Sequence, residues 1–556
     1  MASILKKLGL GGKQTPAAQS PTFESPRQSY VNGGEVKNGV AVNGRTSSNE
    51  EPEADAIIAP GGLTFEEGTS GGLGRHLGLV STTLLIIGRI IGTGIFSTPS
   101  SITASVGSVG AALMLWVLGL ALSFCGLFVW LEFGTMFPRS GGEKVYLEAV
   151  YKSPKLLATV IFSTYAILLG FTASGCIVFA SNIIVAAGHT STPWMQRGIA
   201  VAVIFWVTAV HTFTPKIGVA IMNGLSSLKV FILVFIVVTG FVVLGGNVKS
   251  VPDPHKSFRN GFAGSVKSSG PYSTALFKVL NSYAGWSNAA YVLNEVKRPV
   301  HTLKIAGPLG LGICGALYLL ANIAYFSVAT PKEIAASGIT VASFFVRKVY
   351  GPTAQRVISA FVALSALGNV MTVTFAQSRV NQELAKEGVI PYGRFWASSW
   401  PSGSPSSGLL LHLIPSFIVI VAIPAGDAYN FILDVEGYPG AIINVFVAVG
   451  LLILRWKAPN IPRPFKVWLP VPFFFLLAQS FLLVAPFLKP PGGKGDTSLP
   501  YWLYPIVGIV VLLSGAVYWY VWRVAYPKLG EFEWVETKET LANGTIIARF
   551  VKSKKE

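Results

Sequence analysis

The chain has 556 residues, of which 51% are hydrophobic and only 12% charged, which excludes a soluble globular protein of this size. We therefore predict an all-α polytopic membrane protein. The net charge of +18 does not indicate nucleic-acid binding, because the basic residues lie in loops and tails between apolar segments. In those positions they suit contact with anionic lipid headgroups.

The N-terminal segment, residues 1–75, is rich in Gly, Ser, Asn and Pro and contains few aromatic residues. Such a segment cannot bury enough apolar surface to offset the entropy of ordering, so we predict a disordered cytosolic tail. Its first residues lack the apolar stretch of a cleavable signal peptide, and we expect the first membrane span to direct insertion.

Apolar segments long enough to cross a bilayer follow this tail. We predict twelve spans, near residues 77–103, 109–133, 155–185, 197–214, 218–245, 274–293, 303–328, 354–378, 407–424, 429–454, 467–488 and 501–524. An even number of spans places both termini on one side. With the termini in the cytoplasm, the inside loops hold fifteen Lys and Arg residues and the outside loops hold twelve, which is the expected sign of the charge bias.

The first span contains Arg89-Ile90-Ile91-Gly92-Thr93-Gly94-Ile95-Phe96 at its middle. Glycine lets the backbone leave helical geometry at low cost, and here two glycines flank one threonine. Backbone groups released at membrane depth must face protein, water or a ligand. The span near 274–293 has a similar weak point at residues 282–288. Paired interrupted helices point to the substrate site of a transporter, although such glycines can also serve only close helix packing.

The C-terminal tail, residues 525–556, has a different pattern. Two segments with strand character, 533–541 and 545–551, flank Asn543-Gly544, which is a strong signal for a tight turn. We expect a small cytosolic β-hairpin there.

Several short motifs follow one another along the chain: Gly92–Phe96, Leu131–Thr135, Ser140–Glu143, Tyr283–Trp286, Asn294–Pro299, Ser378-Arg379, Lys386–Pro391 and Arg463–Val467. In their type and order they resemble the large neutral amino acid transporter branch of the amino acid–polyamine–organocation superfamily. The chain looks most like the fungal methionine permeases of that branch.

The resemblance implies a LeuT-like fold, in which spans one to five repeat as spans six to ten in inverted orientation and helices 1 and 6 are broken. It divides the chain into a ten-helix transport core, residues 77–454, and two accessory transmembrane helices, residues 467–524. It also implies a sodium-independent carrier of large neutral L-amino acids, with methionine as a candidate substrate, that is proton-coupled or exchanging.

Substrate binding is expected where the two broken helices meet. The helix half that starts near Gly94 presents free N–H groups and a positive dipole end to a carboxylate, and free carbonyls near both breaks can accept from an ammonium. The substrate-binding residues predicted in this way are Ile90, Gly92, Thr93, Gly94, Asn281, Ser282 and Ala284. Asn281 and Trp286 are the expected gate, and Asn281 stands where the family often has an aromatic residue.

Ionisable residues inside spans need a partner or a role. Lys229 matches a family lysine that takes the place of a sodium ion and can bond carbonyls of the broken first helix. Arg89 needs an anion, for which Asp434, Glu436, Glu295 and Glu132 are candidates. Asp434 working near Arg89 could couple transport to protons, or the two could form a permanent structural pair.

Some partners are not expected. Cys125, Cys176 and Cys314 all fall within apolar spans, and the loop at 186–196 lacks the cysteine with which mammalian members bind a heavy chain. We therefore expect no disulfide-linked partner. The six histidines show no metal-ligand spacing, and no P-loop or nucleophile elbow is present, so neither a metal, a cofactor nor an enzyme is predicted.

The predicted function is secondary active transport of an amino acid across the membrane, most simply the plasma membrane. The alternative is an amino-acid-sensing receptor with a carrier-like fold, which would bind substrate without translocating it. The residues do not define the preferred amino acid, the choice between proton symport and exchange, the oligomeric state, or a role of the tails in turnover.

Overall fold

The computed structural model describes residues 77–423, 428–488, 499–541 and 544–554. In these ranges the chain is mostly helical, and ten helices are long and apolar enough to cross a membrane. The predicted all-α membrane class is therefore confirmed. The N-terminal segment predicted to be disordered lies outside the described residues.

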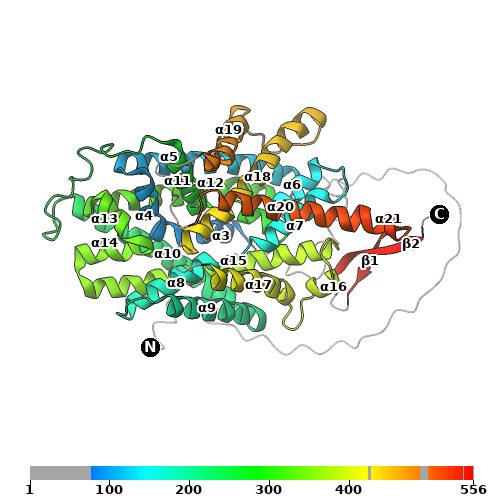
Figure 1. Cartoon of the computed structure of the whole chain (residues 1–556), viewed down its shortest axis with the longest axis horizontal. Coiled ribbons are helices and arrows are strands. Elements are labelled where there is room, and N and C mark those ends of the chain that lie inside the picture. Colours follow the sequence, from blue (N-terminus) through cyan, green and yellow to red (C-terminus); the bar gives the residue numbers. More distant parts are fainter. Residues whose placement is uncertain (1–76, 424–427, 489–498, 542–543, 555–556) are drawn as a thin grey trace, which may run out of the picture. The chain divides into compact units, whose positions relative to one another are not determined.

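Both predicted helix interruptions are present. The first span consists of α3 (Leu79–Ile90) and α4 (Gly94–Val106), separated by three non-helical residues (Figure 1). The sixth consists of α11 (Ser269–Tyr283), four turn residues and the 3₁₀ helix η3 (Asn288–Glu295). Glycine at these points lets the chain leave helical geometry, as the sequence indicates.

A further interruption, which the sequence pattern does not predict, divides the third span at Leu169–Thr172. A Cβ at Gly170 would lie 2.1 Å from the carbonyl oxygen of Ala166, so this turn admits only glycine. The Gln377 side chain donates a hydrogen bond of 2.8 Å to that same carbonyl. A side chain from a distant helix therefore satisfies the backbone group that the interruption releases. The helices of this first half are α5 (Val109–Met136), α6 (Glu143–Val150), α7 (Leu157–Leu168), α8 (Ala173–Ala186), α9 (Pro193–Phe213) and α10 (Pro215–Leu244).

The second half contains several short helices in its connections, including three in the segment between the seventh and eighth spans. The elements are α12 (Pro299–Val328), α13 (Pro331–Ala336), η4 (Gly338–Thr340), α14 (Val341–Tyr350), α15 (Pro352–Lys386), α16 (Gly393–Trp396), α17 (Ser406–Ala422), α18 (Ala428–Lys457), α19 (Pro470–Val484), η5 (Ala485–Phe487), α20 (Leu503–Tyr520), the π-helix η7 (Val521–Ala525) and α21 (Tyr526–Leu529). Ten predicted spans meet the length and hydropathy expected of a membrane helix. The other two correspond to the broken α11–η3 and to α17, so the total of twelve stays a prediction.

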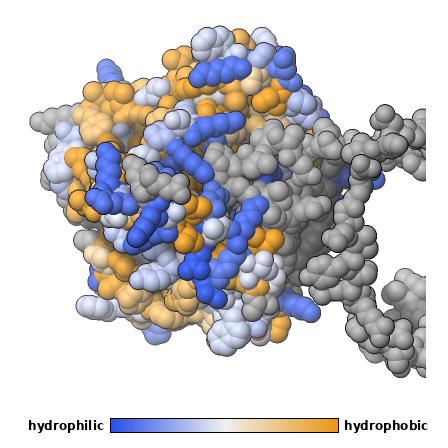
Figure 2. All heavy atoms as spheres, turned by 90° about the vertical axis from the view of Figure 1, so that its right-hand side faces the viewer, coloured by the Kyte–Doolittle hydropathy of each residue, from blue (hydrophilic) through white to orange (hydrophobic). Residues whose placement is uncertain are grey.

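One end of the molecule carries the C-terminal strands. β1 (Phe532–Thr540) and β2 (Ile546–Lys554) pair antiparallel, while Asn543 of the predicted turn lies outside the described residues. Lys155 forms an ion pair of 2.9 Å with Glu536 of β1, which joins the strand to the loop before α7. Figure 2 views this end and shows hydrophilic residues gathered over it, with hydrophobic residues around them.

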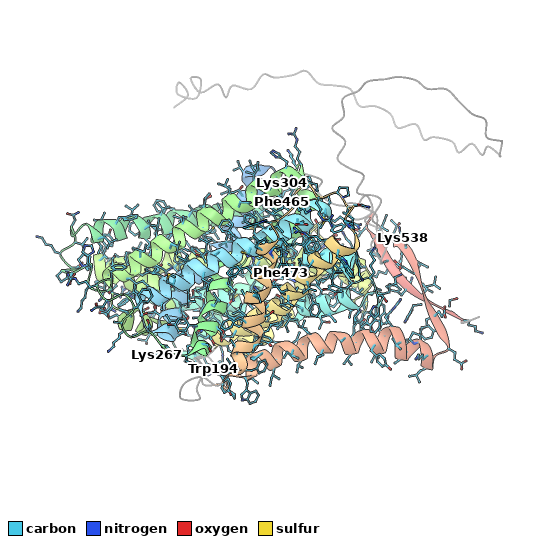
Figure 3. All side chains as sticks on the ribbon, turned by 90° about the horizontal axis from the view of Figure 1, so that it is seen from above. Trp194, Lys267, Lys304, Phe465, Phe473 and Lys538 are labelled. Carbon is cyan, nitrogen blue, oxygen red and sulfur yellow. The ribbon has the colours of Figure 1, made fainter. Side chains whose placement is uncertain are left out.

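A buried ion pair joins two of the sequence motifs that are far apart in the chain. Glu132, in α5, is fully buried; the Arg455 guanidinium donates to both of its carboxylate oxygens, and Arg463 lies 3.4 Å away. The Val467 N–H donates to the same carboxylate at 2.8 Å. Glu132 therefore has a structural role and is not the anion of Arg89. Nearby, Lys304 donates to the Pro464 carbonyl, and Figure 3 shows its side chain beside Phe465.

Replacing Glu132 with glutamine should strongly destabilise the fold. Two guanidinium groups would lose their buried counter-charge, a change that typically costs about 3–5 kcal/mol. The measurement is the thermal unfolding temperature of the purified protein in detergent. Glu333→Gln is the control, because Glu333 pairs with Lys348 in a partly exposed site and such pairs contribute about 1 kcal/mol or less. Equal unfolding temperatures for both variants would contradict the structural role of Glu132.

Candidate functional site

The N-terminus of α4 lies directly against α11. Thr93 precedes α4 and makes no side-chain capping hydrogen bond, so the first N–H groups of the helix lack partners within it. A Cβ built at Gly94 would lie 2.7 Å from Oγ of Ser282 and 2.9 Å from its Cα. Only glycine at this position therefore allows the two broken helices to approach so closely.

The Ser282 hydroxyl holds the two broken helices together. It donates to the Lys278 carbonyl of its own helix at 2.8 Å and lies 2.9 Å from Oγ1 of Thr98 in α4. Both atoms are buried. The hydroxyl is thus already engaged in a contact between α4 and α11.

A small cavity of about 80 Å³, the central cavity, lies where the two breaks meet. Side chains from the interruption of the third span, from α15 and from α18 complete its wall, among them Phe171, Asn369, Tyr429 and Leu433. All of the predicted substrate-binding residues line it: Ile90, Gly92, Thr93, Gly94, Asn281, Ser282 and Ala284. Trp286 of the predicted gate does not.

The expected role of the Ile90 carbonyl is wrong. This oxygen accepts a hydrogen bond of 2.6 Å from the Tyr318 hydroxyl and another of 2.7 Å from the Gly92 N–H. Its acceptor positions are therefore occupied within the protein. At the end of α11 the Asn281 carbonyl accepts a hydrogen bond of 3.0 Å from the Ala284 N–H, and the other last carbonyls of the helix are the remaining candidate acceptors for an ammonium.

A second cavity of about 280 Å³, the adjoining cavity, borders the central one. Arg89, Asn281, Ala284 and Glu436 line both. The predicted gate residue Trp286 lines the adjoining cavity, where its ring packs edge-on against Trp130 with centroids 5.2 Å apart. The small residues at 284 and 285 also border this space, which leaves room there for an apolar side chain.

Lys229 lies in α10 and is fully buried. Its Nζ donates a hydrogen bond of 2.8 Å to the Gly88 carbonyl, in the last turn of α3 before the break. The ammonium thus binds a carbonyl of the broken first helix, which is the kind of contact expected for it.

The two acidic residues of α18, Asp434 and Glu436, interact with different basic residues. Glu436 supplies the opposite charge for Arg89, whereas Asp434 faces Lys278 of α11. Two residues along an α-helix point in nearly opposite directions, so Asp434 and Glu436 cannot share one partner. Glu436, one of the predicted candidates, and not Asp434, is therefore the carboxylate whose charge acts on Arg89. The side chain of Glu295 lies outside those described.

Two residues of this region were missed by the sequence analysis. The Asn369 amide in α15 donates to the Arg89 carbonyl at 3.2 Å, and Tyr318 in α12 occupies the Ile90 carbonyl. Both bind backbone groups released by the first break. Asn369 could have been found, because a polar amide in an apolar span is by default a candidate functional residue.

The described residues offer neither a cluster of metal ligands nor a disulfide at this site. In the described part of the chain, no three His, Cys, Asp or Glu residues are grouped as metal ligands. Cys125, Cys176 and Cys314 are free thiols, two of them buried.

The comparisons with known proteins agree with this geometry. A family model described as "Amino acid permease" matches residues 77–512. The high-affinity methionine permease of Saccharomyces cerevisiae is 39% identical over 468 residues, covering 83% of this chain and 81% of that protein. The low-affinity methionine permease of the same yeast is 32% identical over 93% of this chain and 94% of its own length. The mouse b(0,+)-type amino acid transporter 1 is 30% identical over 82% of this chain and 89% of its own length.

Proposed function

This chain belongs to the amino acid permease family and is an amino acid transporter, and we propose that it carries large neutral L-amino acids, methionine among them. The yeast relatives named as methionine permeases support that substrate. The proposal rests above all on one observation, the cavity bounded by the N-terminus of α4 and the C-terminus of α11.

In the proposed pose, the substrate carboxylate lies at the N–H groups of Thr93 and Gly94. These groups lack partners within α4, and the positive end of the helix dipole favours an anion. The ammonium faces the carbonyls at the end of α11. These two contacts recognise any α-amino acid, so selectivity must come from the space around the side chain.

We place the substrate side chain in the adjoining cavity of about 280 Å³. The central cavity is much smaller than the adjoining one, about 80 Å³ against about 280 Å³, so it suits the two charged α-groups better than a whole methionine. The adjoining cavity of about 280 Å³ opens beside Ala284, and apolar residues such as Phe162, Leu280 and Trp286 line it. Large apolar side chains fit this position.

The interrupted first and sixth spans support a LeuT-like inverted repeat of ten helices, followed by two accessory helices. We propose twelve spans in all, with both termini cytoplasmic in the plasma membrane and basic loops against anionic lipid. No disulfide-linked heavy chain is required, because no cysteine occurs between α8 and α9.

Uptake into proteoliposomes tests this function. Purified protein should accumulate radiolabelled L-methionine, and large neutral amino acids should compete, with no requirement for sodium. Saturable binding without accumulation would favour the receptor alternative, which none of the permease and transporter relatives supports. Uptake of only cationic or acidic amino acids would contradict the proposed substrate class.

Proton coupling, if present, should depend on Glu436. Glu436 is the carboxylate whose charge acts on Arg89, and both residues line the central and the adjoining cavity. The hydroxyl groups of Tyr165 and Tyr291 also interact with the Arg89 charge. A carboxylate whose pairing changes between the open states of a carrier takes up and releases a proton. Uptake should then rise as external pH falls, and Glu436→Gln should flatten that dependence while retaining exchange.

The measurement is the initial uptake rate across a series of external pH values. Asp253→Asn is the matched control, because it removes a carboxylate from an exposed pair with Arg259 in a loop. It should leave the pH profile unchanged. A Glu436→Gln protein with the pH profile of the unmodified protein would show that this pair is only structural.

A further inference from the structure

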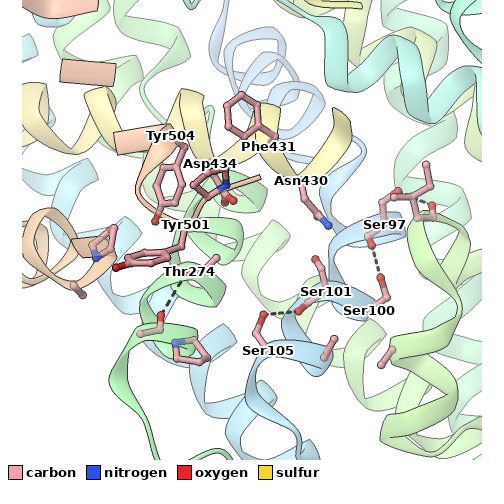
Figure 4. Close-up of a pocket in the computed structure, with 18 of the residues that line it drawn as sticks. Ser97, Ser100, Ser101, Ser105, Thr274, Asn430, Phe431, Asp434, Tyr501 and Tyr504 are labelled. Carbon is pink, nitrogen blue, oxygen red and sulfur yellow. Dashed lines mark hydrogen bonds between the residues drawn. The ribbon is translucent and has the colours of Figure 1, made fainter. Parts of the chain in front are cut away.

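A third cavity, the large cavity, lies outside the candidate site. Its volume is about 420 Å³, and it is lined by α4, the start of α11, the start of α18 and the ends of the segment that connects α19 to α20. Figure 4 shows its labelled residues. None of the residues predicted to bind substrate lines this cavity, but Asp434 does.

Asp434 has an unused acceptor in this cavity. Its side chain is 2% exposed, and its Oδ1 has no hydrogen-bond partner among the described residues. Lys278, which is fully buried, supplies the opposite charge but does not line the cavity. A buried carboxylate needs both a charge partner and hydrogen bonds. Lys278 supplies the charge partner from outside the cavity, whereas Asp434 Oδ1 still lacks a hydrogen-bond donor.

Two further buried atoms on the same wall lack partners in the described structure, Oδ1 of Asn430 and the hydroxyl of Tyr504. An amide oxygen only accepts, and a tyrosine hydroxyl can accept as well as donate. The cavity thus presents a carboxylate oxygen, an amide oxygen and a hydroxyl, none of them satisfied. Figure 4 shows Asp434, Asn430 and Tyr504 around one space.

The serine hydroxyls of α4 add to this acceptor character, because each directs its own proton to a carbonyl. Ser97 donates to Ile339, Ser100 to Ser97, Ser101 to Thr98, and Ser105 to Ser101, at 2.9, 3.1, 3.1 and 2.8 Å. The lone pairs that remain can only accept. A site made of acceptors around one carboxylate suits a cationic donor, and a primary ammonium offers three N–H groups.

The cavity also has an apolar part. Phe431, Ile339 and Leu488 line it together with prolines and alanines. An ammonium-bearing ligand with an apolar side chain fits this combination better than an inorganic cation, which would leave the apolar surface exposed to water.

The cavity adjoins the substrate site along two helices. On α4, Ser97 lines it while Gly94 lines the central cavity, one turn or about 5 Å further along the axis. On α18, Asn430 and Asp434 face the large cavity, and Tyr429 and Leu433 face the central one. The other end of the large cavity reaches α13 and η4, in the connection that we assign to the outside.

We propose that this cavity is a second amino acid site, in which Asp434 binds the substrate ammonium before the substrate reaches the central cavity. The inference rests on the proposed transport of neutral amino acids. It makes Asp434 a substrate-binding residue of the outer approach, with no role at Arg89.

Equilibrium binding of radiolabelled L-methionine to the purified full-length chain in lipid nanodiscs tests the proposal. The unmodified protein should bind two molecules per chain. Asp434→Asn should weaken one of the two sites at least tenfold and leave the other intact. Gly94→Val should eliminate the other, central site. The Asp253→Asn control should retain both sites with unchanged affinity.

A second variant distinguishes loss of the site from misfolding, because Asp434→Asn leaves Lys278 without its counter-charge. Ala104 is exposed and lines the large cavity, so Ala104→Trp fills the space without touching the buried pair. It should remove the same site as Asp434→Asn. L-methioninol, which keeps the ammonium and lacks the carboxylate, should displace methionine only from the Asp434 site, and N-acetyl-L-methionine should displace it from neither.

The outcomes separate the two proposals. One methionine per chain in the unmodified protein, lost in Gly94→Val and retained in Ala104→Trp, would overturn the second site and leave the transport function in place. Two sites that both persist in Ala104→Trp and Asp434→Asn would also overturn it. Absence of both binding and uptake in the unmodified protein would instead contradict the proposed substrate class.

Discussion

Amino acid uptake should fall at least a hundredfold when Gly94 is replaced by valine, while the protein remains folded in the membrane. A Cβ at this position would lie 2.7–2.9 Å from the Cα, Cβ and Oγ atoms of Ser282. Because one of these atoms is backbone, the clash cannot be relieved by a rotamer change. The valine would separate α4 from α11 and displace the N–H groups proposed to bind the carboxylate. Displacing such positioned groups by about 1 Å can cost about a hundredfold in rate.

The measurement is the initial rate of L-methionine uptake into proteoliposomes, normalised to the amount of reconstituted protein. Gly198→Val is the matched control, because a Cβ there meets no atom within 4 Å and the residue lies in α9, away from both breaks. It should transport at the normal rate. A Gly94→Val protein that transports as fast as this control would show that the substrate site lies elsewhere.

Uptake by the unmodified protein should be independent of sodium, and Lys229→Ala should reduce it at least tenfold. The Lys229 ammonium donates to the Gly88 carbonyl at 2.8 Å with its side chain fully buried. Alanine would leave that carbonyl unpaired, at a cost of about 1–3 kcal/mol, and would open a cavity behind the first break. Both effects loosen α3 at the residues that position Gly92 and Thr93.

Uptake rates with imposed sodium or potassium gradients, for both proteins, provide the measurement. Lys216→Ala is the control, since Lys216 is an exposed lysine in the first turn of the same helix. Stimulation of the unmodified protein by a sodium gradient would contradict the assignment of Lys229 as a replacement for a bound ion. Normal uptake by Lys229→Ala would show that its hydrogen bond to Gly88 is dispensable.

The membrane class, the positions of the helices and both interruptions can be predicted from the residues alone. The predicted span at 109–133, for example, is observed as α5 at Val109–Met136. Hydropathy sets these segments because a bilayer tolerates only helices with internally satisfied backbones, and glycines mark where a helix can stop at low cost. The predicted substrate-binding residues all line the central cavity because they lie within a few positions of the two breaks, whereas the residues of the third span, α15 and α18 that complete its wall do not follow from this reasoning.

Partners that come from different helices are decided by tertiary structure. Arg89 faces Glu436 and not Asp434, because the rotation of α18 about its axis is set by packing and not by its composition. The interruption near Gly170 depends on Gln377, which lies in a helix more than two hundred residues later. The Ile90 carbonyl is likewise occupied by Tyr318, which no local pattern could place there. Local sequence thus indicates where the first and sixth spans open, and only the packed bundle decides which side chains satisfy the backbone groups released there and which groups remain available to a substrate.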